Sequence, residues 1–155
     1  MPSYRRVVTG LNEAGKSCVI LDGAAGIAGE GQARTLLMWK TDQAPASNEG
    51  NDDAADEPSS FAFPRGGSKF VIVHFPPGTS EHNGRGMHAS NTLDYGVVLG
   101  GRITIVLEDG EADLGPGDLI IDRGVPHAWR NTGSEDAVVL WTILDAEPVG
   151  AGATV

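Results

Sequence analysis

Apolar and polar positions alternate along much of the chain with the two-residue period of β-strands. In the segment from Lys69 to Phe75, one face carries Phe70, Ile72 and His74, and the other carries Val71, Val73 and Phe75. Short apolar segments at 95–99, 103–107, 119–122, 128–131 and 138–144 are separated by turns rich in glycine, proline and aspartate. No segment has the period of an amphipathic helix. The pattern predicts an all-β sandwich or barrel.

Three further strands are expected before this region, at 4–9, 18–21 and 34–40, where β-branched and apolar residues cluster. Residues 41–60 carry six acidic side chains and no Lys or Arg, which predicts a mobile acidic loop. The 155 residues fit one domain. We expect a single domain over 1–155, with N-terminal strands at 4–40, the acidic loop at 41–60 and the barrel motifs at 69–146.

The segment Gly10–Ser17 matches the phosphate-binding pattern GxxxxGK[ST]. A phosphate-binding loop leads into a helix, but the residues after Ser17 are β-branched and end at a turn. The interpretation we favour is a hairpin loop, and no nucleotide cofactor is expected.

Two stretches in the second half, Asp94–Gly101 and Pro116–Asn131, resemble the two motifs of the cupin superfamily. The stretch Asp94–Gly101 resembles the end of the first motif, with Asp94 where cupins usually carry Glu. The stretch Pro116–Asn131 resembles the second motif, from its PGD turn to a histidine followed four residues later by asparagine. The resemblance is to small single-domain members. It implies a double-stranded β-helix, or jelly-roll barrel, here with extra N-terminal strands.

The resemblance also implies a site inside the barrel. Its metal ligands would be His88, Asp94 and His127, and the metal a divalent ion such as Fe, Zn, Mn or Ni. This chain departs from the family pattern in having a single His88 where cupins carry His-x-His, and in a second motif one residue shorter. The alternative is a metal-free barrel in which the histidines and Asp94 bond to each other.

Three other side chains are candidates for binding a substrate. Trp129 shares a strand face with His127 and is expected in the pocket, the alternative being plain core. His74 lies on an apolar strand, where it either lines the pocket or is a hydrogen-bonded core histidine. His82 lies in a polar loop leading into the first motif. Tyr95, of opposite parity to Asp94, is expected on the outer face.

Composition narrows the possible partners. The net charge of -10 disfavours nucleic acids and anionic membrane surfaces as ligands. The single cysteine, Cys18, excludes an internal disulfide. There is no apolar signal-peptide core and no apolar stretch of about 18 residues, so a cytoplasmic location is expected. By analogy with cupins, the N-terminal strands are expected to contribute to a homodimer.

The sequence leaves three functions open. The first is a metal-dependent enzyme, of oxygenase, lyase or isomerase type, acting on a small organic substrate. The second is a non-catalytic cupin that binds or senses a small ligand, with or without a metal. The third is a metal-free enzyme that uses the same histidine and aspartate side chains for proton transfer.

Overall fold

The computed structural model describes residues 4–25, 34–57, 62, 65–80 and 86–154. Every regular element in these ranges is a β-strand, as the alternating pattern predicts. The strands are β1 (Arg5–Leu11), β2 (Ser17–Ala24), β3 (Arg34–Thr41), β4 (Ser68–Phe75), β5 (Thr92–Gly100), β6 (Ile103–Leu107), β7 (Glu111–Leu114), β8 (Leu119–Asp122), β9 (His127–Arg130) and β10 (Ala137–Asp145). The sequence pattern did not assign β7 separately, because its polar residues (Glu-Ala-Asp) resemble the turn before it.

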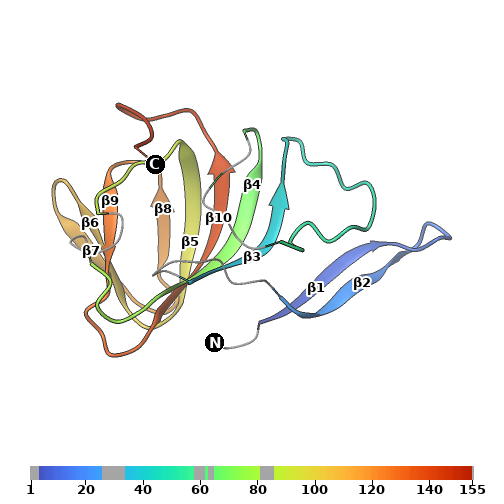
Figure 1. Ribbon diagram of the computed structural model, residues 1–155, viewed down its shortest axis with the longest axis horizontal. Helices are drawn as coiled ribbons and strands as arrows, with labels where there is room; N and C mark the ends of the chain where they lie inside the picture. The colour runs from blue at the N-terminus through green and yellow to red at the C-terminus, as the bar shows by residue number, and fades with distance from the viewer. Residues whose placement is uncertain (1–3, 26–33, 58–61, 63–64, 81–85, 155) are drawn as a thin grey trace.

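Two antiparallel sheets make the barrel. The larger has the strand order β3-β4-β10-β5-β8 and the smaller has the order β7-β6-β9. Figure 1 shows them curving toward each other on the left, with the β1–β2 hairpin on the right. Their facing sides bury one apolar core, made by Leu37, Ala55, Val71, Phe75, Val98, Ile103, Ala137, Val139 and Trp141.

Strand β5 shows how alternation sets the inside of the barrel. A Cβ atom added to Gly96 would lie 2.5 Å from the Trp141 indole, so only glycine leaves room for that ring. Val98 is buried in the same core, whereas Tyr95 is 43% exposed. Because alternate residues share a face, Asp94 points inward with Gly96 and Val98, as predicted.

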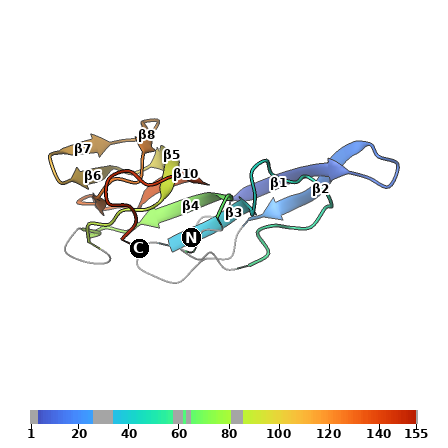
Figure 2. The same ribbon diagram turned by 90° about the horizontal axis from the view of Figure 1, so that it is seen from above.

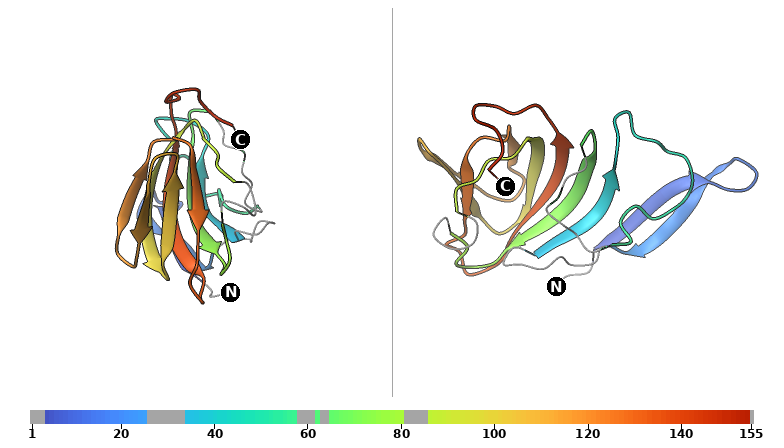
Figure 3. Two further views of the ribbon diagram at one scale, coloured as in Figure 1. Left: turned by 90° about the vertical axis from the view of Figure 1, so that its left-hand side faces the viewer. Right: turned by 45° about the horizontal axis from the view of Figure 1, so that its top comes forward.

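The N-terminal strands form a separate two-stranded sheet. Figures 2 and 3 show this hairpin extending away from the barrel. The segment that matches the phosphate-binding pattern closes the hairpin, with Asn12 N donating to the Lys16 carbonyl at 2.9 Å. Near the base of the hairpin, Tyr4 and Ala25 pack on the outer face of β3 and β4, against Leu36, Met38 and Ile72.

The acidic loop, for which mobility is expected, contacts the rest of the protein at several of its described residues. Ala55 is 3% exposed and belongs to the barrel core. Asp53 forms a salt bridge with Arg6 of the hairpin, and Glu57 Oε1 lies 2.7 Å from Lys40 Nζ. The net charge of the loop alone therefore does not predict its contacts, because Arg6 and Lys40 pair with two of its carboxylates.

One end of the barrel gathers the elements that matter for function. There β3, β8 and β10 end while β4, β5 and β9 begin, at the top of Figure 1. The C-terminal segment crosses this end, where Ala146 N donates to the Asn91 carbonyl at 3.0 Å and Thr154 N to the Ala89 carbonyl at 2.9 Å. Among the described ranges there is no helix with the length and hydrophobicity that a membrane crossing requires.

Candidate functional site

The two motif histidines face each other at the top of the barrel. His127 begins β9, and His88 pairs with it in an isolated antiparallel bridge whose two N···O distances are both 2.9 Å. The centroids of the two imidazole rings are 4.5 Å apart. The chain therefore brings together two histidines that lie 39 positions apart in sequence.

Backbone carbonyls orient both imidazoles. His88 Nδ1 lies 3.1 Å from the Gly86 carbonyl oxygen, and His127 Nδ1 lies 2.9 Å from that of Val125. A carbonyl oxygen only accepts hydrogen bonds, so each Nδ1 carries the proton. In the neutral tautomer this leaves the lone pair on Nε2, the arrangement that suits a general base or a metal ligand.

Asp122 is a site residue that the sequence analysis missed. It is 3% exposed, and its Oδ2 lies 3.0 Å from His127 Nδ1. Its Oδ1 accepts a hydrogen bond of 2.9 Å from Gly124 N. The sequence signal for Asp122 was its place in the alternation of β8. Ile120 and Asp122 lie on one face of this strand, and Leu119 and Ile121, which are 73% and 58% exposed, lie on the other. A carboxylate at an inward position of a short strand marks a polar site.

Asp94 completes the cluster from the neighbouring strand, directly opposite Asp122 in the β5–β8 register. Burial raises the pKa of Asp94 to about 6. A hydrogen bond from Thr92 and the nearby His127 act in the other direction, while the charge of Asp122 adds to the increase. Its Oδ1 is buried without a hydrogen-bond partner, which is costly in a folded protein and typical of a site kept for a ligand or a proton.

The pKa of His127 shifts upward through its carboxylate neighbours. Burial alone lowers it, but the hydrogen bond and the charge of Asp122, together with the Val125 carbonyl and Asp94, outweigh burial. Near neutral pH the cluster therefore holds a carboxyl group and an imidazole that can both exchange protons.

The other candidate residues divide into two groups. Trp129 lies inside the barrel beside His127, with ring centroids 5.6 Å apart, and it also contacts Phe75 and Trp141. His74 points to the opposite side of β4, where its Nε2 lies 3.0 Å from the Tyr4 hydroxyl and its Nδ1 lies 3.4 Å from Asp136. The structure does not bring His74 to the other histidines, because its side chain lies on the same face of β4 as Ile72, whereas Phe75 lies on the face toward the barrel core. His82 lies outside the described residues.

The fit to a metal ion is partial. The imidazole and carboxylate donors suit a divalent ion. Both histidines bond to backbone carbonyls through Nδ1, which leaves Nε2 for a metal, and Asp94 Oδ1 has no hydrogen-bond partner. As the described side chains stand, however, no group of three His, Cys, Asp or Glu residues is placed to hold an ion.

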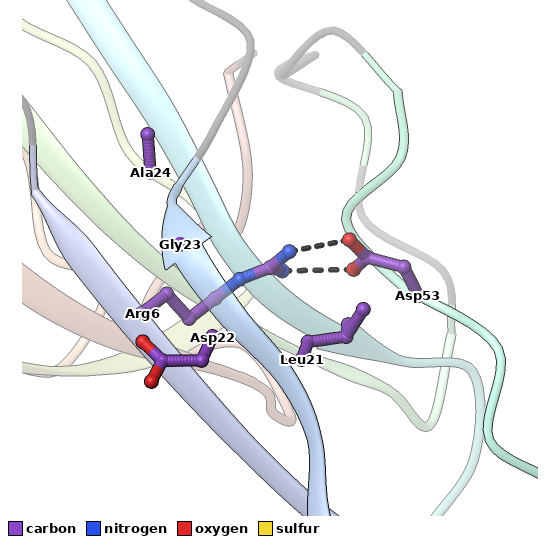
Figure 4. Close-up of a pocket in the computed structure, with 6 residues that line it drawn as sticks. All are labelled: Arg6, Leu21, Asp22, Gly23, Ala24 and Asp53. Carbon is purple, nitrogen blue, oxygen red and sulfur yellow. Dashed lines mark hydrogen bonds and ion pairs between the residues drawn. The ribbon is translucent and has the colours of Figure 1, made fainter.

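A hollow of about 180 Å³ lies at the hairpin and is lined by Arg6, Leu21, Asp22, Gly23, Ala24 and Asp53. Figure 4 shows the Arg6 guanidinium bonded to the Asp53 carboxylate across it. The same guanidinium donates to the Met38 carbonyl at 2.9 Å. The Arg6 guanidinium, by bonding to Asp53, thus holds the acidic loop to the hairpin.

Comparison with known proteins places the chain in a family. The model of the cupin domain matches residues 71–143. A cupin-domain-containing oxidoreductase, fogC of Aspergillus ruber, is 31% identical over 154 residues, covering 93% of this chain and 73% of the relative. Another, virC of Hypocrea virens, is 29% identical over 160 residues, covering 96% of this chain and 80% of the relative. This chain therefore belongs to the cupin family.

Solved structures support the fold. The cupin domain of Schizosaccharomyces pombe Cnp3 superposes with a TM-score of 0.53 at 12% identity, covering 93% of this chain and 89% of that domain. The jelly-roll barrel implied by the motifs is thereby confirmed.

Proposed function

We propose that this chain is a cupin enzyme of the oxidoreductase class that acts on a small organic substrate at the end of the barrel where His88, Asp94, Asp122 and His127 meet. The observation that carries the proposal is the buried Asp122–His127 pair directly beside a buried Asp94 oxygen without a partner. The relatives named cupin-domain-containing oxidoreductases support the reaction class.

The protein's own residues supply proton transfer. Asp122 and the Val125 carbonyl hold His127 by its Nδ1, which leaves Nε2 as the atom that takes or gives a proton. Asp94, whose pKa is near 6, is poised to accept a proton from a substrate hydroxyl or an acidic C–H group. The aromatic side chains of Trp129 and Phe75 provide an apolar surface for the body of the substrate.

An oxidoreductase also needs a redox group, and we propose a divalent metal held by His88, Asp94 and His127. His127 Nε2 and the Asp94 carboxylate would then be ligands of the ion, so the proton transfers described above belong to the ion-free protein. When bound, such an ion would supply electron transfer and open coordination positions for the substrate. Asp122 would then act behind the metal ligands by fixing the tautomer of His127.

A second candidate function is a non-catalytic cupin that binds a small ligand. It is favoured by the single His88 in the first motif and by the lack of an assembled three-donor group among the described residues. Absence of bound metal would exclude the first candidate, because the proposed redox chemistry depends on it.

We also propose that the chain forms a homodimer through its hairpin. Val7, Leu11 and Val19 lie on one face of β1–β2 and are 48%, 57% and 55% exposed. A two-stranded sheet is marginally stable alone, and a second copy would cover these three apolar side chains.

Elemental mass spectrometry of the untagged protein, purified without chelator or added metal, tests the metal-dependent function. We expect close to one equivalent of a redox-active metal (Fe, Mn or Ni), lost in His88→Ala and in Asp94→Ala. The matched control is His74→Gln, which changes a histidine on the other side of β4. Absence of metal from the native protein, even after anaerobic reconstitution, would leave the ligand-binding function in its place.

A further inference from the structure

The short segment that carries His88 is held by contacts with other parts of the chain. None of residues 86–91, all of them described, belongs to a strand, and His88 pairs with His127 through an isolated bridge. In an extended chain the backbone groups of consecutive residues point to opposite edges. His88 bonds to His127 on one edge, so Ala89 bonds on the other. The position of the His88 imidazole therefore depends on what lies at that second edge.

The partner at the second edge is Thr154, in the segment that follows β10. The Thr154 backbone N donates to the Ala89 carbonyl, and the Thr154 Oγ1 accepts from Ala89 N, both at 2.9 Å. Ala89 is 3% exposed, so water has little access to replace these bonds. Removal of the Thr154 hydroxyl would therefore take the acceptor from a buried donor, which is the costly way to lose a hydrogen bond.

The sheet register brings the two segments together. Thr92, the first residue of β5, lies opposite Asp145, the last residue of β10. The chain that enters β5 and the chain that leaves β10 therefore start side by side, and Ala146 N donates to the Asn91 carbonyl. Figure 3 shows the segment after β10 curving back over this end of the barrel. We call this segment, residues 146–154, the strap.

A glycine-containing turn returns the strap to the site. Gly150 and Gly152 have φ angles of 62° and 81°, which residues with a side chain rarely adopt. After this turn Ala153 N donates to Asn91 Oδ1 at 2.8 Å, next to the bonds between Thr154 and Ala89. Both ends of the strap thus bond to the segment that carries the first motif histidine.

On the basis of the proposed function, we infer that Thr154 is a positioning residue for His88, and that docking of the strap is coupled to binding at the site. Thr154 acts through Ala89, the residue next to His88. An ion bound at His88 favours the docked strap, and by linkage the docked strap favours binding of the ion. Local release of the strap therefore loosens the site while the two barrel sheets stay folded.

Hydrogen exchange resolved by residue with NMR tests the positioning role on the full, metal-free chain. In Thr154→Val, which keeps the shape of threonine without its hydroxyl, the amides of Ala89 and His88 should both exchange about tenfold faster, because the segment opens as one unit. Thr154→Ser retains the acceptor and should exchange at close to the native rates. Thr132→Val, the same change at an exposed residue between β9 and β10, is the matched control.

The probes for the coupling are Fe²⁺, Mn²⁺ and Ni²⁺, added one at a time under anaerobic conditions. Hydrogen exchange followed by mass spectrometry, in which the acid quench releases the ion, reads the peptide that covers the strap. At about one hundred times its Kd, a bound ion should slow exchange of the strap in the native protein by about tenfold or more. The strap contains none of the proposed ligands, so its protection reports coupling rather than direct contact with the ion.

Faster exchange of Ala89 alone in Thr154→Val, with His88 at the native rate, would overturn the positioning role while the barrel site stands. A strap whose exchange does not respond to a bound ion would overturn the coupling. If none of the three ions binds to the native protein, the coupling fails together with the metal-dependent function. The exchange of His88 in Thr154→Val and Thr154→Ser still decides the role of Thr154 in that case.

Discussion

Asp94 shows how a single residue reveals the site. A carboxyl group inside a barrel loses hydration, so its ionised form is disfavoured and its pKa rises to about 6. Beside it, Asp122 is also buried but bonds to His127 and to the backbone of Gly124. Two carboxylates on opposed residues thus have different partners, which is how acid and base roles become separated in one site.

Asp94→Asn is expected to stabilise the metal-free protein at high pH. The folded pKa lies above the ordinary value of 3.8. Stability linked to the protonated group is therefore present at low pH and is lost as the pH rises through about 6. The substitution should raise the free energy of unfolding by on the order of 3 kcal/mol at pH 8 and by little at pH 4. Urea denaturation of chelator-treated protein measures both values.

Asp109→Asn, in the exposed turn between β6 and β7, is the control and should leave the stability unchanged at both values of pH. A destabilised Asp94→Asn variant at pH 8 would mean that the Asp94 carboxylate is favourably bonded in the metal-free fold.

At the scale of elements, alternation predicted which faces of the strands line the barrel. It assigned Asp94, Gly96 and Val98 to the inside of β5 and Tyr95 to the outside, and the packing of Trp141 on Gly96 agrees. The motif spacing also indicated His88 and His127, which lie side by side. Local pattern is enough here because each of these positions is set by the two-residue period of its own strand.

The parts of the fold and the site that the sequence did not predict depend on pairing between distant segments. Asp122 joins the site through its register with β5. The side of β4 that faces the barrel could not be chosen from β4 alone, since both faces are apolar, and this left the position of His74 open. The acidic loop was expected to be mobile because its partners, Arg6 and Lys40, lie on other elements.

Asp53→Ala is expected to loosen the acidic loop. The salt bridge to Arg6 and the hydrogen bond from Ala55 N to Asp53 Oδ1, 2.9 Å long, both hold the loop in place. Hydrogen exchange followed by mass spectrometry should show faster exchange over 51–57, with β5 and β10 unchanged. Asp52→Ala, an exposed neighbour, serves as the control. Equal exchange in the two variants would assign the order of the loop to Ala55 alone.

At the scale of the whole molecule, the β1–β2 hairpin is a separate two-stranded sheet that is not part of the two barrel sheets. It projects from the barrel (Figure 2), and its side chains Val7, Leu11 and Val19 are exposed. The dimer proposal predicts that Val19→Lys converts the protein to a monomer in sedimentation velocity at micromolar concentration. Leu119→Lys, which replaces a residue of β8 that is 73% exposed, should remain dimeric. A native protein that sediments as a monomer contradicts the proposed interface.

The central claim is that the barrel encloses a coupled centre of Asp94, Asp122 and His127. Carbon-detected NMR titration of the aspartate carboxyl groups in metal-free protein tests it most directly, with Asp122→Asn for comparison. The account predicts that Asp94 titrates near pH 6. In Asp122→Asn, the pKa of Asp94 and that of His127 should both fall, because each is raised by the Asp122 carboxylate. An Asp94 that titrates at its ordinary value of 3.8 and does not respond to Asp122→Asn would contradict the claim.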